Sequence, residues 1–134
     1  MSKVIVLISA ILIIACQNKS TTPESVKSEL LNTTEFVAQL EYFDNEQLVD
    51  LRTPAEVQEG FIPNALFIDF NDTPTFEAKI QNLDKNKPVM IYCRSGGRSG
   101  KTAKILIDQG FNHVIDLDGG FTAWEKANLP VDTP

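Results

Sequence analysis

Apolar positions along this chain fall into short runs, separated by polar segments in which apolar residues recur with helical spacing. The run at residues 88–92 is continuously apolar, which is typical of a strand buried on both faces. Because strands alternate with helices, the pattern predicts one three-layer α/β domain with a mainly parallel sheet flanked by helices. Strands are expected at residues 47–51, 65–70, 88–92 and 113–117. Helices are expected at residues 32–40, 53–60, 73–82, 99–109 and 121–126.

Specific signals mark where some of these helices begin and end. Glu35 stands at capping-box distance from Asn32, which predicts a helix start there. Thr53 is placed as an N-cap, with Pro54 at the first helical position, where its missing N–H costs nothing. Gly110 follows the helix at residues 99–109 as its C-terminal cap.

The first sixteen residues, MSKVIVLISAILIIAC, have the character of a targeting segment. The apolar run at residues 4–14 would span less than roughly 20 Å as a helix, short of a hydrocarbon core of about 30 Å. The pattern therefore predicts a signal peptide over residues 1–15. Its end, Ile-Ile-Ala-Cys, resembles the bacterial lipobox, in which Cys16 becomes the lipidated first residue. A plain signal peptide cut near Ala15, or an uncleaved anchor, is the alternative.

Residues 16–27 are rich in Ser, Thr, Asn and Lys and predict a flexible tether, with the domain following at residues 28–134. A lipidated Cys16 would anchor the chain to a membrane and place the domain in the cell envelope, in a periplasmic or other extracytoplasmic compartment. The sequence does not indicate which membrane. In an oxidising compartment a lone thiol in the domain, Cys93, needs a functional explanation.

Composition narrows the choice of function. The chain has 134 residues, 43% of them hydrophobic, and a formal net charge of -6. Such an acidic chain is a poor match for nucleic acid, whose phosphates need clustered Lys and Arg. Two cysteines, Cys16 and Cys93, and one histidine, His113, are too few for a disulfide framework or a zinc site. We therefore expect no metal, no cofactor and no nucleic acid, and a monomer.

Candidate chemistry follows the buried strand at residues 88–92, where the chain reads Cys93-Arg94-Ser95-Gly96-Gly97-Arg98-Ser99 before a helix. The carboxyl end of a strand is where open α/β sheets bind ligands. The two glycines allow consecutive N–H groups to turn inward as an anion-binding nest, and the helix N-terminus adds its dipole. Together with Arg94 and Arg98, these groups predict a lowered pKa for the Cys93 thiol.

Other interpretations of the same segment stay open. A cysteine at the end of a strand is often a small buried hydrophobic residue. A glycine-rich turn before a helix can be simple connection geometry, or can hold a nucleotide phosphate. A phosphate loop should end in Lys-Ser or Lys-Thr, whereas Lys101-Thr102 falls inside the predicted helix.

The lone histidine also limits the reaction. Cysteine hydrolases need a histidine base, and nothing in the sequence places His113 near Cys93, so we expect His113 to be a surface residue. Sulfur transfer needs no proton shuttle at the nucleophile. A thiolate attacks the outer sulfur of a thiosulfate-like donor, and sulfite leaves as a stable anion. Cyanide or a thiolate then accepts the sulfur.

At these residues the sequence resembles the rhodanese family of sulfurtransferases in its single-domain form, over about residues 28–131. The resemblance implies a five-stranded parallel sheet, a persulfide on Cys93 and no metal. Two positions depart from the family pattern: Phe61 stands where His is usual, and Asn64 stands where Gly is usual. Three segments carry the resemblance: Asp50–Glu56 continuing into Gly60–Ala65, the loop Cys93–Ser99, and Gly119–Trp124 with Leu129–Val131.

Roles follow for the individual residues. Cys93 is the expected nucleophile, and the N–H groups from Arg94 to Ser99, through Ser95, Gly96 and Gly97, would hold the transferred sulfur. Arg94 and Arg98 would attract the anionic donor, and the Ser99 hydroxyl would donate to the persulfide or cap the helix. Asp50 and Arg52 are interpreted first as a structural ion pair and second as substrate contacts. Phe111, Phe121 and Trp124 are expected in the core.

Two alternatives remain beside an enzymatic sulfurtransferase. One is a persulfide carrier or binding module without turnover. The other is a cysteine-based phosphatase or arsenate reductase of the same fold, whose loop has five residues between Cys and Arg. Here four residues separate Cys93 from Arg98, which suits one sulfur atom better than a tetrahedral oxyanion. Every one of these functions requires the thiol to face a pocket open to solvent.

Overall fold

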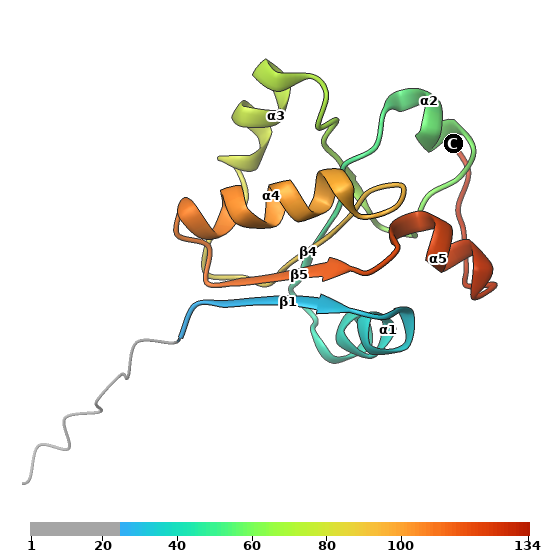
Figure 1. Cartoon of the computed structure of the whole chain (residues 1–134), viewed down its shortest axis with the longest axis horizontal. Coiled ribbons are helices and arrows are strands. Elements are labelled where there is room, and N and C mark those ends of the chain that lie inside the picture. Colours follow the sequence, from blue (N-terminus) through green and yellow to red (C-terminus); the bar gives the residue numbers. More distant parts are fainter. Residues whose placement is uncertain (1–24) are drawn as a thin grey trace, which may run out of the picture.

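The computed structural model describes residues 25–134. The predicted signal peptide, Cys16 and most of the predicted tether lie outside the described residues. Residues 25–134 form a five-stranded sheet whose strand pairs are all parallel, with helices on both faces (Figure 1). No helix within this range has the length and apolar character needed to span a membrane. The predicted three-layer α/β class is confirmed.

Most predicted elements are present, with shifted ends. The strand β3 is only two residues long, against the expected 65–70, and α4 begins at Gly97 rather than Ser99. The strand β1 was not predicted, and it begins at Lys27, inside the expected tether. In order, the elements are β1 (Lys27–Leu31), α1 (Thr33–Tyr42), β2 (Gln47–Asp50), α2 (Pro54–Gln58), β3 (Leu66–Phe67), α3 (Thr73–Ile80), β4 (Val89–Tyr92), α4 (Gly97–Asp108), β5 (His113–Leu117) and α5 (Gly120–Lys126).

The strand β1 lies at the edge of the sheet, which explains why its sequence gives a weak signal. It pairs only with β5, and its Leu30 side chain is largely exposed. An edge strand that buries little needs no regular alternation of apolar residues. The extended conformation of residues 27–31 therefore depends more on pairing with β5 than on the pattern of their own side chains.

The strand order β1-β5-β4-β2-β3 places β4 at the centre of the sheet. In the register of the ladders, Tyr92 lies opposite Asp50 of β2, and Ile91 lies opposite Asp116 of β5. Because the strands are parallel, the carboxyl ends of β2, β4 and β5 meet at one edge. Cys93 follows β4 at that edge, flanked by one aspartate on each side.

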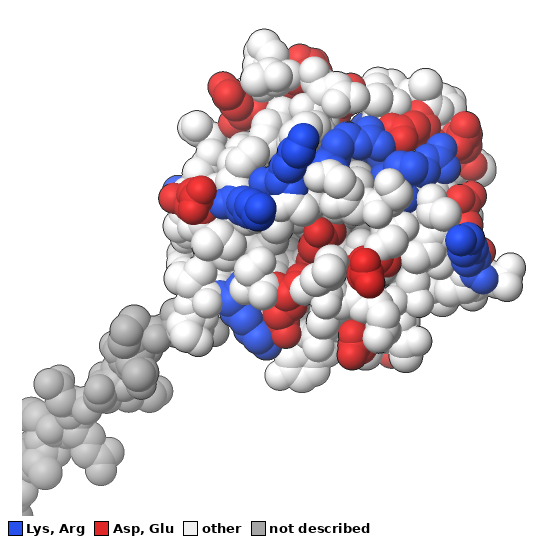
Figure 2. Space-filling model, viewed as in Figure 1, with Lys and Arg blue, Asp and Glu red and all other residues white. Residues whose placement is uncertain are grey.

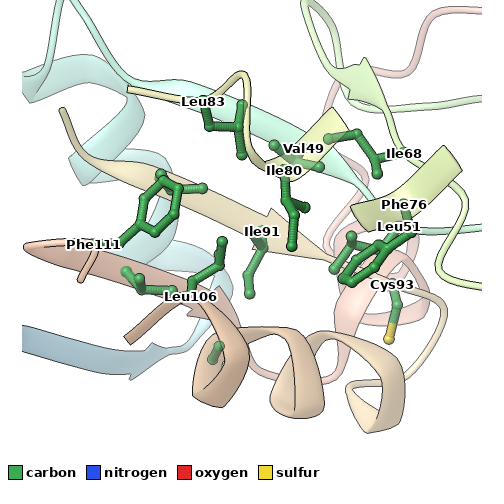
Figure 3. Close-up of a cluster of buried hydrophobic side chains, with 13 residues drawn as sticks. Val49, Leu51, Ile68, Phe76, Ile80, Leu83, Ile91, Cys93, Leu106 and Phe111 are labelled. Atoms are coloured by element: carbon green, nitrogen blue, oxygen red, sulfur yellow. The ribbon is translucent and has the colours of Figure 1, made fainter. Parts of the chain in front are cut away.

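Alternate residues of β4 point to opposite faces and build two separate hydrophobic cores. Val89 and Ile91 pack with α3 and α4, in the core that Figure 3 shows. Met90 and Tyr92 pack with α1 and α5 on the other face. The expected core positions are confirmed: Phe111, Phe121 and Trp124 are all buried.

Capping boxes fix the starts of α1 and α2. The box at α1 and the N-cap Thr53 of α2 were predicted, whereas the part of Glu56 in the second box was not. At α2, the Glu56 N–H donates to the Thr53 hydroxyl, and the Thr53 N–H donates to the Glu56 carboxylate at 2.9 Å. The equivalent box at α1 joins Asn32 and Glu35. The box at α2 also holds the Glu56 carboxylate in place beside the loop that follows β4.

Candidate active site

The Cys93 sulfur is directed away from the hydrophobic core and toward the helix that carries Leu106, α4 (Figure 3). The Gly96 N–H donates to Sγ at 3.1 Å, and the Ser99 Oγ lies 3.5 Å from Sγ. These groups come from the loop and from the first turn of α4. The thiol thus meets polar groups at the helix start rather than packed apolar side chains.

Burial and hydrogen bonding act in opposite directions on this thiol. Burial raises the pKa of Cys93, but hydrogen bonds from the Ser99 hydroxyl and from the N–H groups of Ser99, Gly96 and Ser95 outweigh it, so the pKa is lowered. The predicted direction is confirmed. The leading causes are amides and a hydroxyl. Arg98 also interacts with the thiolate, because Cys93 is among the groups that raise the pKa of Arg98.

One glycine of the loop has the unusual backbone that was predicted for two. Gly96 has a φ of 111° and caps α4, a conformation that other residues rarely adopt. Gly97 has no positive φ, because it is already the first residue of α4. The expectation for Gly97 was therefore wrong, since α4 begins two residues earlier than predicted.

The start of α5 holds the other side of the loop. The Phe121 N–H donates to the Cys93 carbonyl at 2.8 Å, and the Thr122 N–H donates to the Arg94 carbonyl at 3.1 Å. This approach is so close that a Cβ on Gly120 would lie 2.5 Å from the Cys93 carbonyl oxygen. Glycine at position 120 therefore allows α5 to bind the loop carbonyls, while later N–H groups of the loop face the sulfur.

Both loop arginines are already paired with carboxylates. Arg98 binds both carboxylate oxygens of Glu56, at 2.8 and 2.7 Å. Arg94 lies 2.6 Å from Glu59, 3.5 Å from Glu56 and 4.0 Å from Glu125. Each guanidinium is thus shared with carboxylates in this arrangement, and the role of Arg94 and Arg98 in attracting an anionic donor stays a prediction.

The glutamate partners are residues that sequence reasoning missed. Hydrogen bonding from Arg98 is the main reason that the pKa of Glu56 is lowered to about 2. The sequence did contain a signal for Glu56, because this residue follows the N-cap Thr53 at the spacing of a capping box. Glu59 follows α2 and Glu125 lies in α5, so their meeting at Arg94 depends on tertiary structure alone.

Asp50 and Arg52 form a fully buried ion pair, which confirms their interpretation as a structural pair. The Arg52 Nη2 lies 2.7 Å from the Asp50 Oδ2, and both side chains are 0% exposed. The Tyr92 hydroxyl donates to the same carboxylate at 2.6 Å, and the guanidinium lies 3.9 Å from the Phe121 ring centroid. A substrate could not reach either residue in this structure.

Asp116 is a second buried aspartate that sequence reasoning did not select. It is 6% exposed, and within residues 25–134 its Oδ1 has no hydrogen-bond partner. Burial raises its pKa to about 6, although the Ser99 side chain lowers it, and Asp118 raises it further. Ser99 thus lies between this carboxyl and the Cys93 sulfur. A charged residue within the apolar strand at residues 113–117 was the available signal.

His113 lies at the start of β5, at the amino edge of the sheet, whereas Cys93 follows the carboxyl end of β4. The predicted separation of the two residues is confirmed. His113 is half-buried rather than a free surface residue, because its Nε2 lies 2.6 Å from the Glu29 carboxylate. Across residues 25–134, no group of three His, Cys, Asp or Glu side chains is arranged to hold a metal ion.

The two departures from the family pattern lie beside α2. Asn64 has a φ of 67°, the left-handed region in which glycine is favoured and asparagine is tolerated. This explains why Asn can stand where Gly is usual. The Phe61 ring packs edge-to-face on Phe67, with ring centroids 5.0 Å apart, so an apolar contact stands where a histidine is usual.

Access to the sulfur differs from expectation. Cys93 is only 1% exposed, so the thiol is not open to solvent in this conformation. The sulfur is enclosed by the backbone of its own loop and by Ser99. A donor therefore reaches the sulfur only when the loop, or a side chain over it, moves aside.

The comparisons with known proteins agree with the fold. The family model described as a rhodanese-like domain matches residues 33–127, so the chain belongs to the rhodanese family. A sulfurtransferase of Allochromatium vinosum is 41% identical over 87 residues, covering 65% of this chain and 78% of that protein. Thiosulfate sulfurtransferase GlpE of Vibrio cholerae is 35% identical over 85 residues, covering 63% and 77%. The crystal structure of a rhodanese-like domain protein from Staphylococcus aureus superposes with a TM-score of 0.66 at 28% identity, covering 81% of this chain and 99% of that one.

Proposed function

We propose that this chain is a sulfurtransferase that moves sulfane sulfur from a thiosulfate-like donor to a nucleophilic acceptor, cyanide or a thiol, through a persulfide on Cys93. The observation that carries the proposal is the ring of donors around Sγ. The Gly96 N–H and the Ser99 hydroxyl favour the thiolate, and the same donors can stabilise the negative outer sulfur of a persulfide. The sulfurtransferase names of the relatives in Allochromatium vinosum and Vibrio cholerae support the same reaction class.

The proposed reaction has two displacement steps. The Cys93 thiolate attacks the outer sulfur of thiosulfate, and the donor S–S bond breaks with its electron pair leaving on sulfite. The acceptor then attacks the outer sulfur of the persulfide, and the electron pair of that S–S bond returns to the Cys93 thiolate. Neither step moves a proton at the nucleophile. This fits the site, because His113 lies at the opposite edge of the sheet from Cys93 and is not placed to act as its base.

Intact mass after thiosulfate treatment tests the intermediate directly. The full-length chain should gain one sulfur atom that cyanide removes as thiocyanate. Cys93→Ser should gain none and should produce no thiocyanate, because the attacking thiolate is gone. Cys16→Ala is the matched control and should load sulfur as the parent does. Equal loading of Cys93→Ser and the parent would refute the proposal.

The same measurements separate the alternative functions. Sulfur loading without repeated thiocyanate production would indicate a persulfide carrier rather than a sulfurtransferase with turnover. Absence of loading together with Cys93-dependent hydrolysis of a phosphate ester would assign the site to phosphatase chemistry. The four-residue spacing between Cys93 and Arg98 favours sulfur transfer over that second result.

We also propose that residues 1–15 are a signal peptide and that Cys16 carries the lipid that anchors the domain in the cell envelope. The support is the sequence Ile-Ile-Ala-Cys after a short apolar run. Labelling of cells with a radioactive palmitate should mark the full-length protein and leave Cys16→Ala unlabelled. Equal labelling of both proteins would show that Cys16 is not the site of lipid attachment.

A further inference from the structure

Carboxylates outnumber guanidinium groups beside the catalytic loop. We call Glu56, Glu59 and Glu125 the acidic rim, because each lies within 4.0 Å of Arg94. Arg98 is the second guanidinium and binds Glu56 at 2.7 Å. In Figure 2, acidic and basic side chains lie close together at the end of the molecule where Figure 1 places α2 and α5. The rim and its two arginines therefore carry a net negative charge, to which the Cys93 thiolate adds.

The net negative charge beside the loop affects how favourably an anionic donor can approach the Cys93 sulfur. The bidentate pair between Arg98 and Glu56 is partly buried, with side-chain exposures of 22% and 20%, so breaking it to bind a donor is costly. The Glu59 and Glu125 side chains are 62% and 48% exposed and hold Arg94 from outside. The electrostatic cost of approaching a net negative site grows in proportion to the charge of the donor.

We propose that Glu59 and Glu125 set the donor specificity of this site by charge, and that its donor is a monoanionic organic sulfane-sulfur compound rather than dianionic thiosulfate. The inference rests on the proposed sulfurtransferase function. In an organic thiosulfonate, R–SO₂–S⁻, a carbon group replaces one charged oxygen of thiosulfate. The transferable sulfur is retained, and one negative charge is lost.

The transfer step balances with this donor. The Cys93 thiolate attacks the outer sulfur of R–SO₂–S⁻ and forms the new S–S bond of the persulfide. The S–S bond of the donor breaks, and its electron pair leaves on the sulfinate R–SO₂⁻. Two negative charges enter and two leave, with no proton, external oxidant or reductant. With thiosulfate the same step must bring three negative charges together beside the rim.

The experiment compares sulfur loading of Cys93 from methanethiosulfonate and from thiosulfate, at low ionic strength, by intact mass at timed intervals. The test variant is Glu59→Gln with Glu125→Gln, which leaves the capping residue Glu56 in place. The matched control is Glu41→Gln with Glu77→Gln. Those two exposed glutamates lie on α1 and α3 and make no ion pair within residues 25–134.

The rim variant should shift the ratio of loading rates roughly fivefold toward thiosulfate. Coulomb's law at roughly 8 Å in water-like surroundings gives about a twofold effect for each carboxylate and each unit of donor charge. Two carboxylates act on the one extra charge of thiosulfate, so their effects multiply. The remote control should stay close to the ratio of the parent, because the Coulomb energy between two charges falls as their separation grows.

Ionic strength gives an independent readout. Added sodium chloride should speed thiosulfate loading of the parent, because it screens repulsion between the donor and a net negative site. In the rim variant, added salt should have little effect on thiosulfate loading, because Arg94 and Arg98 then balance Glu56 and the Cys93 thiolate. The size of the salt effect therefore reports the net charge of the site, whatever the intrinsic reactivity of each donor.

The outcomes separate this inference from the function on which it rests. A shifted ratio together with a smaller salt effect in the rim variant than in the parent supports charge selection by Glu59 and Glu125. Loading by both donors with the same ratio and the same salt effect in parent, rim variant and remote control would overturn the inference and leave the sulfurtransferase function standing. Failure of both donors to load the parent at Cys93 would refute the sulfurtransferase function itself.

Discussion

The strand that leads into Cys93, β4, has a buried aspartate in the neighbouring strand on each side. The two aspartates differ in the hydrogen-bond partners of their carboxylates. Asp50 of β2 lies on the face covered by α1 and α5, and its carboxylate is met by Arg52 and Tyr92. Asp116 of β5 lies near Ser99 of α4 and, within residues 25–134, leaves one oxygen without a partner. A paired buried carboxylate braces a fold, whereas an unpaired one stays able to change its protonation near neutral pH.

The paired side connects the active edge to the core. Arg52 donates to Asp50 and also to the Gly60 carbonyl at 2.7 Å, and the Tyr92 hydroxyl accepts from the Ile62 N–H at 3.1 Å. The Arg52 guanidinium and the Tyr92 hydroxyl therefore both donate hydrogen bonds within this cluster. Within residues 25–134 the Asp116 side has no such network, and the Asp116 carboxyl is separated from the Cys93 sulfur by one serine side chain. We infer that the first side supplies rigidity and the second supplies pH sensitivity.

The largest effect is expected from Asp50→Asn, which removes the charge of the paired aspartate and leaves Arg52 buried without a counter-ion. Breaking one partner of a buried ion pair should lower the free energy of unfolding by about 4 kcal/mol. Urea unfolding of the full-length chain measures this loss. Asp44→Asn, at an exposed aspartate before β2, is the matched control and should change the free energy by less than about 0.5 kcal/mol. Similar losses in the two variants would contradict the structural role of the pair.

The contrast between the two aspartates also shows what the sequence determines. The order of the elements after β1, the central buried strand and the loop from Cys93 to Ser99 follow from local patterns, and each is present in the structure. The ion pair of Asp50 and Arg52 was also predicted, because the two residues are neighbours in a recognisable motif. Tyr92 joins them across 42 positions, through the register of two parallel strands, which no local pattern encodes.

The parts of the candidate site that could not be predicted depend on how separate elements are oriented. Arg94 and Arg98 were identified, but their carboxylate partners come from α2 and α5, which meet the loop only after the sheet has formed. The burial of Cys93 likewise depends on the early start of α4. A charge on a motif residue can therefore be identified from the sequence, while whether that charge is free for a ligand depends on tertiary contacts.

A smaller effect is expected from Tyr92→Phe, which keeps the ring and removes the hydroxyl that joins Asp50 to the Ile62 N–H. The loss of a hydrogen bond to a charged group, with one buried N–H left unpaired, should lower the free energy of unfolding by about 2 to 3 kcal/mol. Urea unfolding at pH 7 measures the change. Tyr42→Phe, at an exposed tyrosine of α1, is the control and should be close to neutral. A neutral Tyr92→Phe would show that the hydroxyl does not brace the paired side.

The smallest effect is expected from Asp116→Asn, and its sign should be opposite. The folded-state pKa of about 6 lies above the ordinary value of 3.8, so folding favours the protonated carboxyl. Wild-type stability from this group is fully present below about pH 4 and is lost as the pH rises through 6, whereas asparagine has no proton to lose. Relative to the parent, the variant should therefore gain about 1 to 2 kcal/mol between pH 4 and pH 7.5, after a discount for partial solvation.

The pH dependence of that difference is the decisive quantity, because the contacts of the asparagine itself contribute equally at both pH values. Urea unfolding of parent and variant at pH 4 and pH 7.5 gives the difference directly. Asp108→Asn, at an exposed aspartate near the end of α4, controls for the loss of one carboxylate from the chain. A difference between Asp116→Asn and the parent that is the same at both pH values would mean that folding does not shift the pKa of Asp116. The two aspartates would then differ in their hydrogen bonds but not in their titration, and the inferred pH sensitivity of the β5 side would be lost.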